Sequence, residues 1–356
     1  MSNNTIFKDL IVIRTFFILV VCTYSLYAQK NIDFNRFDEI LEEKYRTGDF
    51  SGISLISVNG KVKYEKAFGY ADFKDEELLF TDSEFNLCNG SDIAKLLSIS
   101  WLIEQNKVSL EDSVSQYLPE FEKYPYITLK NILTHTSGLE DINPDNELTK
   151  YNDNRSLIEE IIQKQDNVNT GNYKYSHVNS IIIAAVIEKI SGLKFEDFFY
   201  ETISPIIGLP RTEFITLKTA FKHSKADSRY ALGYKKTQSE EIIEMDPENE
   251  TLNYPEGNLW SGGNDILKMY DFLFQSEYIS DGTLEKVLGS NTSPVLFKKI
   301  GSIENPGYGF EGECDGYNVL FYYFPGTKTQ FILLSNYGFS DLFNDEYEIL
   351  KVINLI

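Results

Sequence analysis

The sequence predicts a mixed fold of the α/β (α+β) class, with strands near both ends of the chain and a mostly helical middle. Residues 52–62 predict a β-hairpin, because Asn59-Gly60 supplies a positive-φ turn between two strand-like stretches. Residues 316–336 predict a second antiparallel pair of strands, joined at Gly326-Thr327. Between the two pairs, apolar residues recur at helical spacing, most clearly in the stretch Ile93–Ile103.

The remaining elements follow from apolar periodicity and from turn residues. Residues 32–45 predict an amphipathic helix with its aromatic and aliphatic side chains on one side. A helix over 178–191, rich in Ile and Ala, is expected to stop at Gly192. Further helices are expected at residues 93–103, 157–163, 195–203, 266–274 and 342–356, and residues 67–72 continue the second strand of the hairpin. Residues 143–154 and 236–252 are polar or charged, and we expect exposed loops there.

Composition narrows the class of protein. The chain has 356 residues, of which 42% are hydrophobic, enough for a large core in one domain or in two interleaved ones. Its formal net charge of −21 argues against nucleic acid and anionic membrane surfaces as partners, because like charges repel. We expect no cofactor or metal, and the oligomeric state is left open.

The first 28 residues predict an export signal. Basic residues Lys8 and Arg14 accompany the apolar run 16–21, and the small residue Ala28 closes the segment. Cleavage near Ala28 would leave residues 29–356 as a periplasmic or secreted protein. The apolar run is short for a membrane span, so no stable membrane insertion is expected after cleavage. Retention of the segment as an uncleaved anchor is the alternative.

The stretch Phe85–Asp92 carries the residues on which the predicted function depends. Asn89-Gly90-Ser91-Asp92 carries small polar side chains suited to a helix start, and the apolar helix that follows should be buried. This stretch resembles the active-site helix of the serine β-lactamase-related family, which includes penicillin-binding proteins, class C β-lactamases and esterases. In that family the helix opens with a nucleophilic Ser, and a Lys three residues later acts as its base. The family's next segments match residues 104–112 and 117–119 here.

The gapless alignment with the family puts Asn89 at the Ser and Asp92 at the Lys. A second alignment would use Ser91 and Lys95, which are four residues apart and can also share a helix face. That alignment needs a two-residue insertion after Phe85 and a compensating deletion, so we favour the gapless one.

Two further family motifs are altered. The stretch Thr134–Leu139 matches the family literally, and the resemblance gives its His135 a structural role. Tyr175 matches the family's Tyr-Ser-Asn motif, whereas His177 replaces the Asn. The family also expects Lys-Thr-Gly or His-x-Gly on the strand that lines the site, yet residues 311–315 contain neither a basic residue nor a His.

These replacements argue against the family's acyl-transfer reaction. The amide of Asn89 is not a nucleophile, so Asp92 has nothing to activate. Tyr175 and His177 can both serve as hydrogen-bonding residues. The side chain of His177 can also change its charge near neutral pH. Two less favoured hypotheses make Cys88 a thiol nucleophile with His177 as its partner, or let Asp92, Tyr175 and His177 hold a metal.

Removal of the signal leaves two cysteines, Cys88 and Cys314. We favour two unrelated buried thiols. The resemblance implies that the active-site helix start and the strand near Cys314 are neighbours, so a disulfide is the alternative in an exported protein.

The resemblance as a whole implies a β-lactamase/transpeptidase-like fold. Its sheet part, about 32–80 and 300–356, would be a five-stranded antiparallel sheet flanked by helices, and the mostly helical part, about 81–299, would be inserted between. We predict a catalytically impaired relative that binds a peptide, cell-wall fragment or small ester in the cleft, with Asn89, Asp92, Tyr175 and His177 at the motif positions. The alternatives are an active serine peptidase or esterase that uses Ser91, Lys95 and Tyr175, and an inert partner of an active paralogue.

Overall fold

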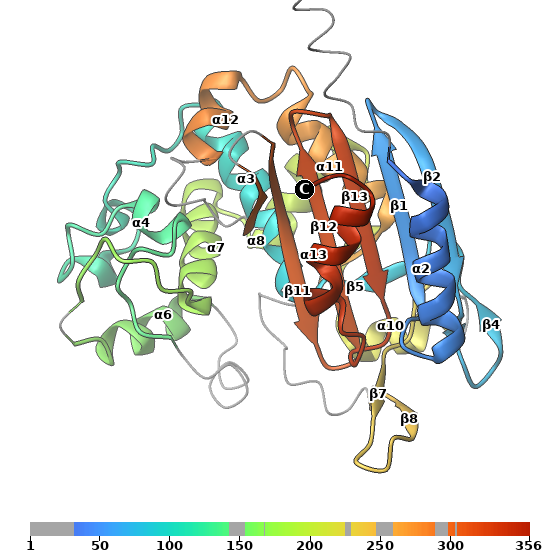
Figure 1. Ribbon diagram of the computed structural model, residues 1–356. Coiled ribbons are helices and arrows are strands. Elements are labelled where there is room, and N and C mark those ends of the chain that lie inside the picture. Colours follow the sequence, from blue (N-terminus) through green and yellow to red (C-terminus); the bar gives the residue numbers. More distant parts are fainter. Residues whose placement is uncertain are drawn as a thin grey trace, which may run out of the picture.

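The computed structural model describes residues 32–141, 154–166, 168–224, 229–246, 259–288, 298–302 and 305–356. The expected signal segment lies outside these residues. The main sheet has six antiparallel strands in the order β10-β11-β12-β13-β1-β2 (Figure 1). Their bounds are β1 Gly52–Val58, β2 Lys61–Phe68, β10 Lys298–Gly301, β11 Pro306–Cys314, β12 Tyr317–Phe324 and β13 Thr329–Ser335.

A strand from the N-terminal part of the chain pairs with one from the C-terminal part inside this sheet. Strand β1 pairs with β13 along its full length, from Gly52 opposite Ser335 to Val58 opposite Thr329. The turn between β1 and β2 is the predicted one, since Asn59 and Gly60 both have positive φ, 52° and 70°. Both predicted strand pairs are therefore confirmed.

The expected number of five strands is wrong, because β10 adds a sixth at the edge. It pairs with β11 over only four residues, from Lys298 opposite Gly309 to Gly301 opposite Pro306. None of its residues is buried. A short edge strand of this kind lacks the alternation of buried and exposed side chains that would reveal it in a sequence.

Helices cover both faces of the sheet. On one face lie α2, Phe34–Thr47, and α13, Leu342–Val352, which form one apolar layer with the sheet (Figure 1). On the other face lie α3, Asp92–Glu104, and α11, Gly263–Phe274. Helix α11 approaches β1 closely at Gly263, where a Cβ would lie 2.5 Å from a methyl carbon of Leu55.

The middle of the chain is mostly helical, as predicted. The other helices are α4 Leu129–Leu133, α6 Asn154–Gln163, α7 His177–Ser191, α8 Phe195–Phe198, α9 Ser204–Ile207, α10 Leu217–Ser224 and α12 Asp281–Leu288, and a π-helical turn, Phe199–Ile203, joins α8 to α9. Helix α7 is buried from Val178 to Ile187, which agrees with its apolar residues on all sides. Among the described residues, no helix combines the length and the apolar character that a membrane crossing needs.

Three small sheets complete the fold. Their strands are β3 Tyr70–Asp72 with β4 Glu77–Leu78, β5 Glu84–Asn86 with β9 Leu259–Gly262 and β6 Thr212–Phe214, and β7 Tyr234–Lys236 with β8 Ile242–Glu244. The β7–β8 hairpin lies partly in the stretch that we expected to be an exposed loop. Strand β5 matters most for the site, because it runs directly into the 3₁₀ turn η1, Cys88–Ser91, and then into α3.

Candidate active site

The turn that precedes α3 is held in one conformation by its own backbone. Cys88 has φ of 50°, an uncommon value for a residue with a side chain. The side chain of Asn86 accepts a hydrogen bond from the Cys88 N–H at 2.8 Å, and Gly90 donates to the Leu87 carbonyl at 2.8 Å. Such a constrained backbone at the start of a buried helix is typical of functional positions. It fixes where the Asn89 side chain begins.

A disulfide joins this turn to the main sheet. Cys88 is bonded to Cys314 at the end of β11, with the two Cα atoms 5.6 Å apart. Our preference for two unrelated thiols is therefore wrong, and so is the hypothesis of Cys88 as a nucleophile, because an oxidised sulfur is no thiolate. The strand also packs tightly here, since a Cβ on Gly312 would lie 2.2 Å from the Leu87 carbonyl oxygen.

The η1 turn carries an amide, that of Asn89, and the first turn of α3 carries a carboxylate, that of Asp92. Asn89 is half-buried, and its side chain forms no hydrogen bond with the residues that the structure describes. Asp92 is only 6% exposed. Its Oδ1 accepts from Lys95 Nζ at 2.9 Å and from the Ser180 hydroxyl on α7. Asp92 is thus the centre of a buried polar cluster that ties α3 to α7.

Ser91 and Lys95 do not form a pair. Lys95 is fully buried, and its ammonium binds Asp92 and lies 5.9 Å from the centre of the Phe195 ring. Ser91 is 1% exposed, and within the described part of the chain its Oγ has no hydrogen-bond partner. A serine nucleophile needs hydrogen-bond contact with its base and access to substrate. The structure gives Ser91 neither.

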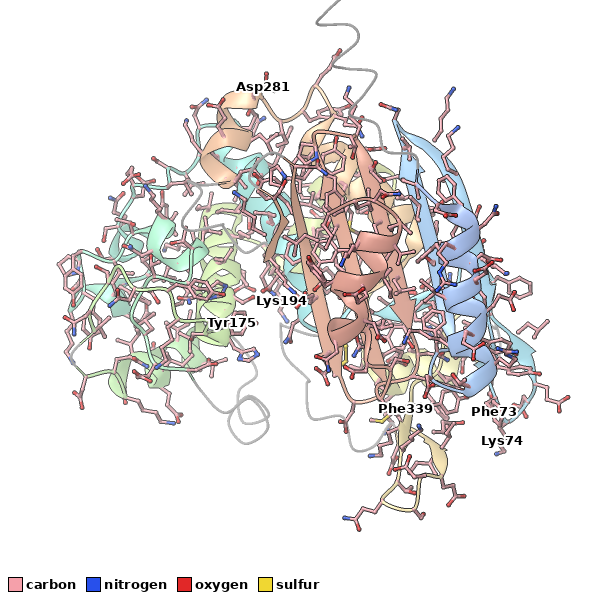
Figure 2. All side chains as sticks on the ribbon, in the orientation of Figure 1. Phe73, Lys74, Tyr175, Lys194, Asp281 and Phe339 are labelled. Carbon is pink, nitrogen blue, oxygen red and sulfur yellow. A yellow bond between two sulfur atoms is a disulfide. The ribbon has the colours of Figure 1, made fainter. Side chains whose placement is uncertain are left out.

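Tyr175 lies beside the two histidines of the altered motifs. It is 40% exposed, at the start of α7 (Figure 2). Its ring stacks on His135 at a centroid distance of 4.7 Å and meets the edge of His177 at 5.1 Å. His135 is buried, and its Nδ1 accepts the Ser176 N–H at 3.3 Å and lies 3.0 Å from the Asn179 amide nitrogen. These contacts agree with a structural role for His135.

The two histidines differ in their surroundings. Burial lowers the pKa of His135, which favours the neutral ring. His177 instead lies with Nδ1 2.9 Å from Asp141 Oδ2, and its backbone N–H donates to the other oxygen of the same carboxylate at 2.9 Å. Asp141 therefore holds the first residue of α7 by both side chain and backbone.

The metal hypothesis finds no support in this geometry. Within the described ranges, no three or more His, Cys, Asp or Glu side chains lie close enough together to hold a metal ion. The carboxylate of Asp92 is engaged by Lys95 and Ser180, and the His177 ring is engaged by Asp141.

The strand expected to carry the third motif ends in a tight turn. Strand β11 stops at Cys314, which pairs with Tyr317 of β12 across the two residues Asp315-Gly316. Gly316 has φ of 83°, a conformation that suits glycine in such turns. The turn between the two strands is only Asp315-Gly316 and contains no Lys-Thr-Gly segment, and the disulfide to Cys88 holds the end of β11.

Two partners of the site were missed by the sequence analysis. Ser180 binds Asp92 across a separation of 88 residues, and Asp141 binds His177 across 36 residues. Neither residue belongs to a motif. The pairing of Asp92 with Lys95 was not predicted either, although its spacing was a readable signal, since opposite charges three apart on a helix can pair.

Comparison with known proteins identifies the family of this chain. The family model described as beta-lactamase matches residues 37–353. The chain belongs to the beta-lactamase family. Among its relatives, the penicillin-binding protein PbpX of Bacillus subtilis is 28% identical over 288 residues, covering 81% of this chain and 71% of the relative. The teichoic acid D-alanine hydrolase of Staphylococcus aureus is 24% identical over 334 residues, covering 93% of this chain and 76% of the relative.

Solved structures show the same fold. The octameric penicillin-binding protein homologue of Pyrococcus abyssi superposes with a TM-score of 0.75 at 18% identity, covering 90% of this chain and 79% of the other. FmtA of Staphylococcus aureus gives a TM-score of 0.72 at 22% identity, covering 93% and 96%. A class C beta lactamase gives 0.72 at 18% identity, covering 90% and 96%. The β-lactamase/transpeptidase-like fold predicted from the motifs is therefore confirmed.

Proposed function

We propose that this member of the beta-lactamase family binds its ligand without forming an acyl-enzyme. The observation that carries the proposal is the buried ion pair between Asp92 and Lys95 in the first turns of α3. In the gapless alignment, this carboxylate occupies the position of the family's base. The nearest buried ammonium neutralises it, so neither group is available to take a proton from a nucleophile.

The nucleophile position leads to the same conclusion. The amide nitrogen of Asn89 has no basic lone pair, and the only hydroxyl in η1, that of Ser91, is buried without a partner. What Asn89 retains is the ability to donate and accept hydrogen bonds from a half-buried side chain. Tyr175 adds an exposed aromatic face. These are the properties of a recognition surface.

The names of the relatives suggest the class of ligand. They are penicillin-binding proteins and a teichoic acid D-alanine hydrolase. We therefore propose that the ligand is a D-alanine-bearing peptide, cell-wall fragment or small ester that this chain holds intact in the family's cleft.

Binding without acylation makes a two-part prediction. A fluorescent penicillin should leave no covalent label on the purified protein. A D-alanine-terminated peptide or D-alanine methyl ester, at about 100 times its dissociation constant, should raise the free energy of unfolding by about 2.7 kcal/mol in a thermal or urea titration.

A matched pair of tyrosine variants controls this experiment. Tyr175→Ala should lose the ligand-dependent stabilisation, whereas Tyr347→Ala should keep it, because Tyr347 is 61% exposed on α13, far along the chain from the motifs. Covalent labelling that disappears in Ser91→Ala would instead establish an active hydrolase. The binding proposal would also be wrong if none of these probes stabilised the protein.

The disulfide supports export of the chain. Disulfides persist in oxidising compartments and are rare in the cytosol, where thiols are kept reduced. The Cys88–Cys314 bond therefore favours the periplasmic or secreted location that we inferred from residues 1–28.

A further inference from the structure

A second polar network lies outside the candidate site and has no part in the proposed binding. Its centre is Glu84, the first residue of β5, which is fully buried. Neither carboxylate oxygen has a hydrogen-bond partner among the residues that the structure describes. A buried acid without hydrogen bonds is costly when ionised, so its presence calls for an explanation.

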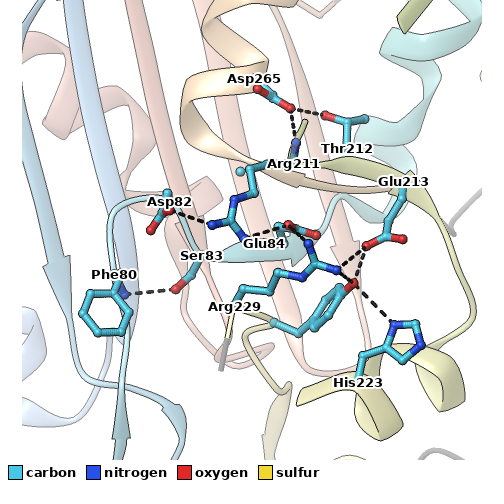
Figure 3. A network of polar contacts seen from close by, with 12 residues as sticks. Phe80, Asp82, Ser83, Glu84, Arg211, Thr212, Glu213, His223, Arg229 and Asp265 are labelled. Atoms are coloured by element: carbon cyan, nitrogen blue, oxygen red, sulfur yellow. Dashed lines mark hydrogen bonds and ion pairs between the residues drawn. The ribbon is translucent and has the colours of Figure 1, made fainter. Parts of the chain in front are cut away.

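Two guanidinium groups lie beside this carboxyl group, on opposite sides of it (Figure 3). Arg211 Nη1 is 3.6 Å and Arg229 Nη1 is 3.7 Å from Glu84 Oε1, too far for hydrogen bonds but close enough for ion pairs. Each arginine also contacts a second polar group. Arg211 Nη2 lies 3.1 Å from Asp82, and Arg229 Nη2 donates to the Tyr230 hydroxyl at 2.8 Å.

The remaining charged and titratable groups complete the surroundings of Glu84. The Tyr230 hydroxyl donates to Glu213 of β6 and lies 3.5 Å from Nδ1 of His223 on α10. Asp265 of α11 accepts from the Arg211 backbone and does not touch Glu84. Burial, together with Glu213, raises the pKa of Glu84 to about 7, although Arg229 and Arg211 lower it. The carboxyl group can therefore change its charge near neutral pH.

We propose that Glu84 is a proton-operated latch, which leaves the Arg229 guanidinium on Tyr230 when it is neutral and draws that guanidinium onto itself when it is ionised. In the structure Arg229 donates to Tyr230 and does not hydrogen-bond to Glu84, which is the arrangement that the latch assigns to the neutral acid. Ionisation creates a buried charge that a shift of less than an ångström in Arg229 would satisfy. That shift removes a hydrogen bond from Tyr230.

The latch lies where it can influence the candidate site. The Glu84 backbone accepts the Ala231 N–H at 2.9 Å and donates to the Arg229 carbonyl at 2.6 Å, so hydrogen bonds join β5 to the segment Arg229–Ala231. Two residues along β5, the Asn86 side chain accepts the backbone N–H of Cys88. The latch is therefore two residues along the same strand from a residue that holds the turn carrying Asn89.

A single tryptophan can report the change. Trp260 of β9 is buried, with its ring 5.8 Å from that of Tyr230. The chain's other tryptophan, Trp101, can be replaced in a Trp101→Phe background. In this background we expect the fluorescence of Trp260 to change sigmoidally with pH, with a midpoint near 7, and the change to vanish when Glu84→Gln is added.

Three further variants test whether Glu84 and Arg229 cause the transition. Adding His223→Gln should leave the transition in place, because the latch does not require that imidazole. Adding Arg229→Gln should abolish the transition, because the variant lacks the guanidinium group that the latch moves. Adding Arg211→Gln should keep the transition and move its midpoint upward, because an opposite charge favours the ionised acid. The Arg229 and Arg211 variants test the proposal even if Glu84→Gln does not fold. The latch is refuted if Trp260 shows no transition, or if the transition survives Glu84→Gln or Arg229→Gln. It is also refuted if His223→Gln abolishes the transition, or if Arg211→Gln leaves the midpoint unchanged or lowers it.

Discussion

Replacing Asp92 with asparagine is expected to lower the free energy of unfolding by about 3 to 5 kcal/mol. The substitution leaves the Lys95 ammonium fully buried without its counter-charge, and breaking a buried pair from one side costs about this much. Urea unfolding at neutral pH, followed by circular dichroism, measures the loss.

The reverse substitution and the double variant separate this pair from general damage to α3. Lys95→Met should be similarly harmful, because it leaves a buried carboxylate with only the Ser180 hydroxyl as a partner. Asp92→Asn combined with Lys95→Met should be less destabilised than the sum of the single variants by about 2 kcal/mol, because no unpaired charge remains. Additive losses would show that Asp92 and Lys95 do not pair in solution.

Removing the disulfide, by changing Cys88 and Cys314 to alanine together, is expected to cost about 3 to 5 kcal/mol. The bond closes a loop with a sequence separation of 226 residues, and cross-links over long loops restrict the unfolded chain most. The loss should appear as a lower urea midpoint for the variant.

Chemical reduction provides the matched control for this variant. The wild-type protein unfolded in the presence of a thiol reductant should be as unstable as the double alanine variant, which itself should not respond to the reductant. A wild-type protein that titrates with two free thiols before any reduction would contradict the disulfide.

Much of the fold could be predicted because its signals are local. The Asn59-Gly60 turn, the uniformly apolar helix over 178–191 and the literal match at Thr134–Leu139 each depend on neighbouring residues. The missed elements had no such signal. Strand β10 has no buried residue, and the β7–β8 hairpin lies in a charged stretch with no more than half-buried strand residues outside Tyr234. Both are stabilised by pairing with a partner strand, which a single sequence does not reveal.

In the candidate site, too, local features could be predicted from the sequence and contacts between distant residues could not. The gapless alignment assigns Asn89 and Asp92 to the family's catalytic positions. In the structure Asn89 lies in η1, and Asp92 is the first residue of α3. Their partners depend on tertiary packing. Ser180 reaches Asp92 only because α7 crosses α3, and Cys314 reaches Cys88 only because β11 ends beside η1. The ion pair with Lys95 was not predicted either, because we considered Lys95 only as a partner of Ser91, although the spacing of Asp92 and Lys95 was visible in the sequence.

We propose that neither η1 nor the first turn of α3 holds a reactive hydroxyl. Intact-mass spectrometry of the folded protein after exposure to a fluorophosphonate, a reagent that forms a covalent adduct with activated serines, tests this proposal. We expect the wild-type mass to remain unchanged, like that of Ser91→Ala under the same conditions. An adduct on the wild-type protein that is absent from Ser91→Ala would contradict the claim and assign catalysis to Ser91.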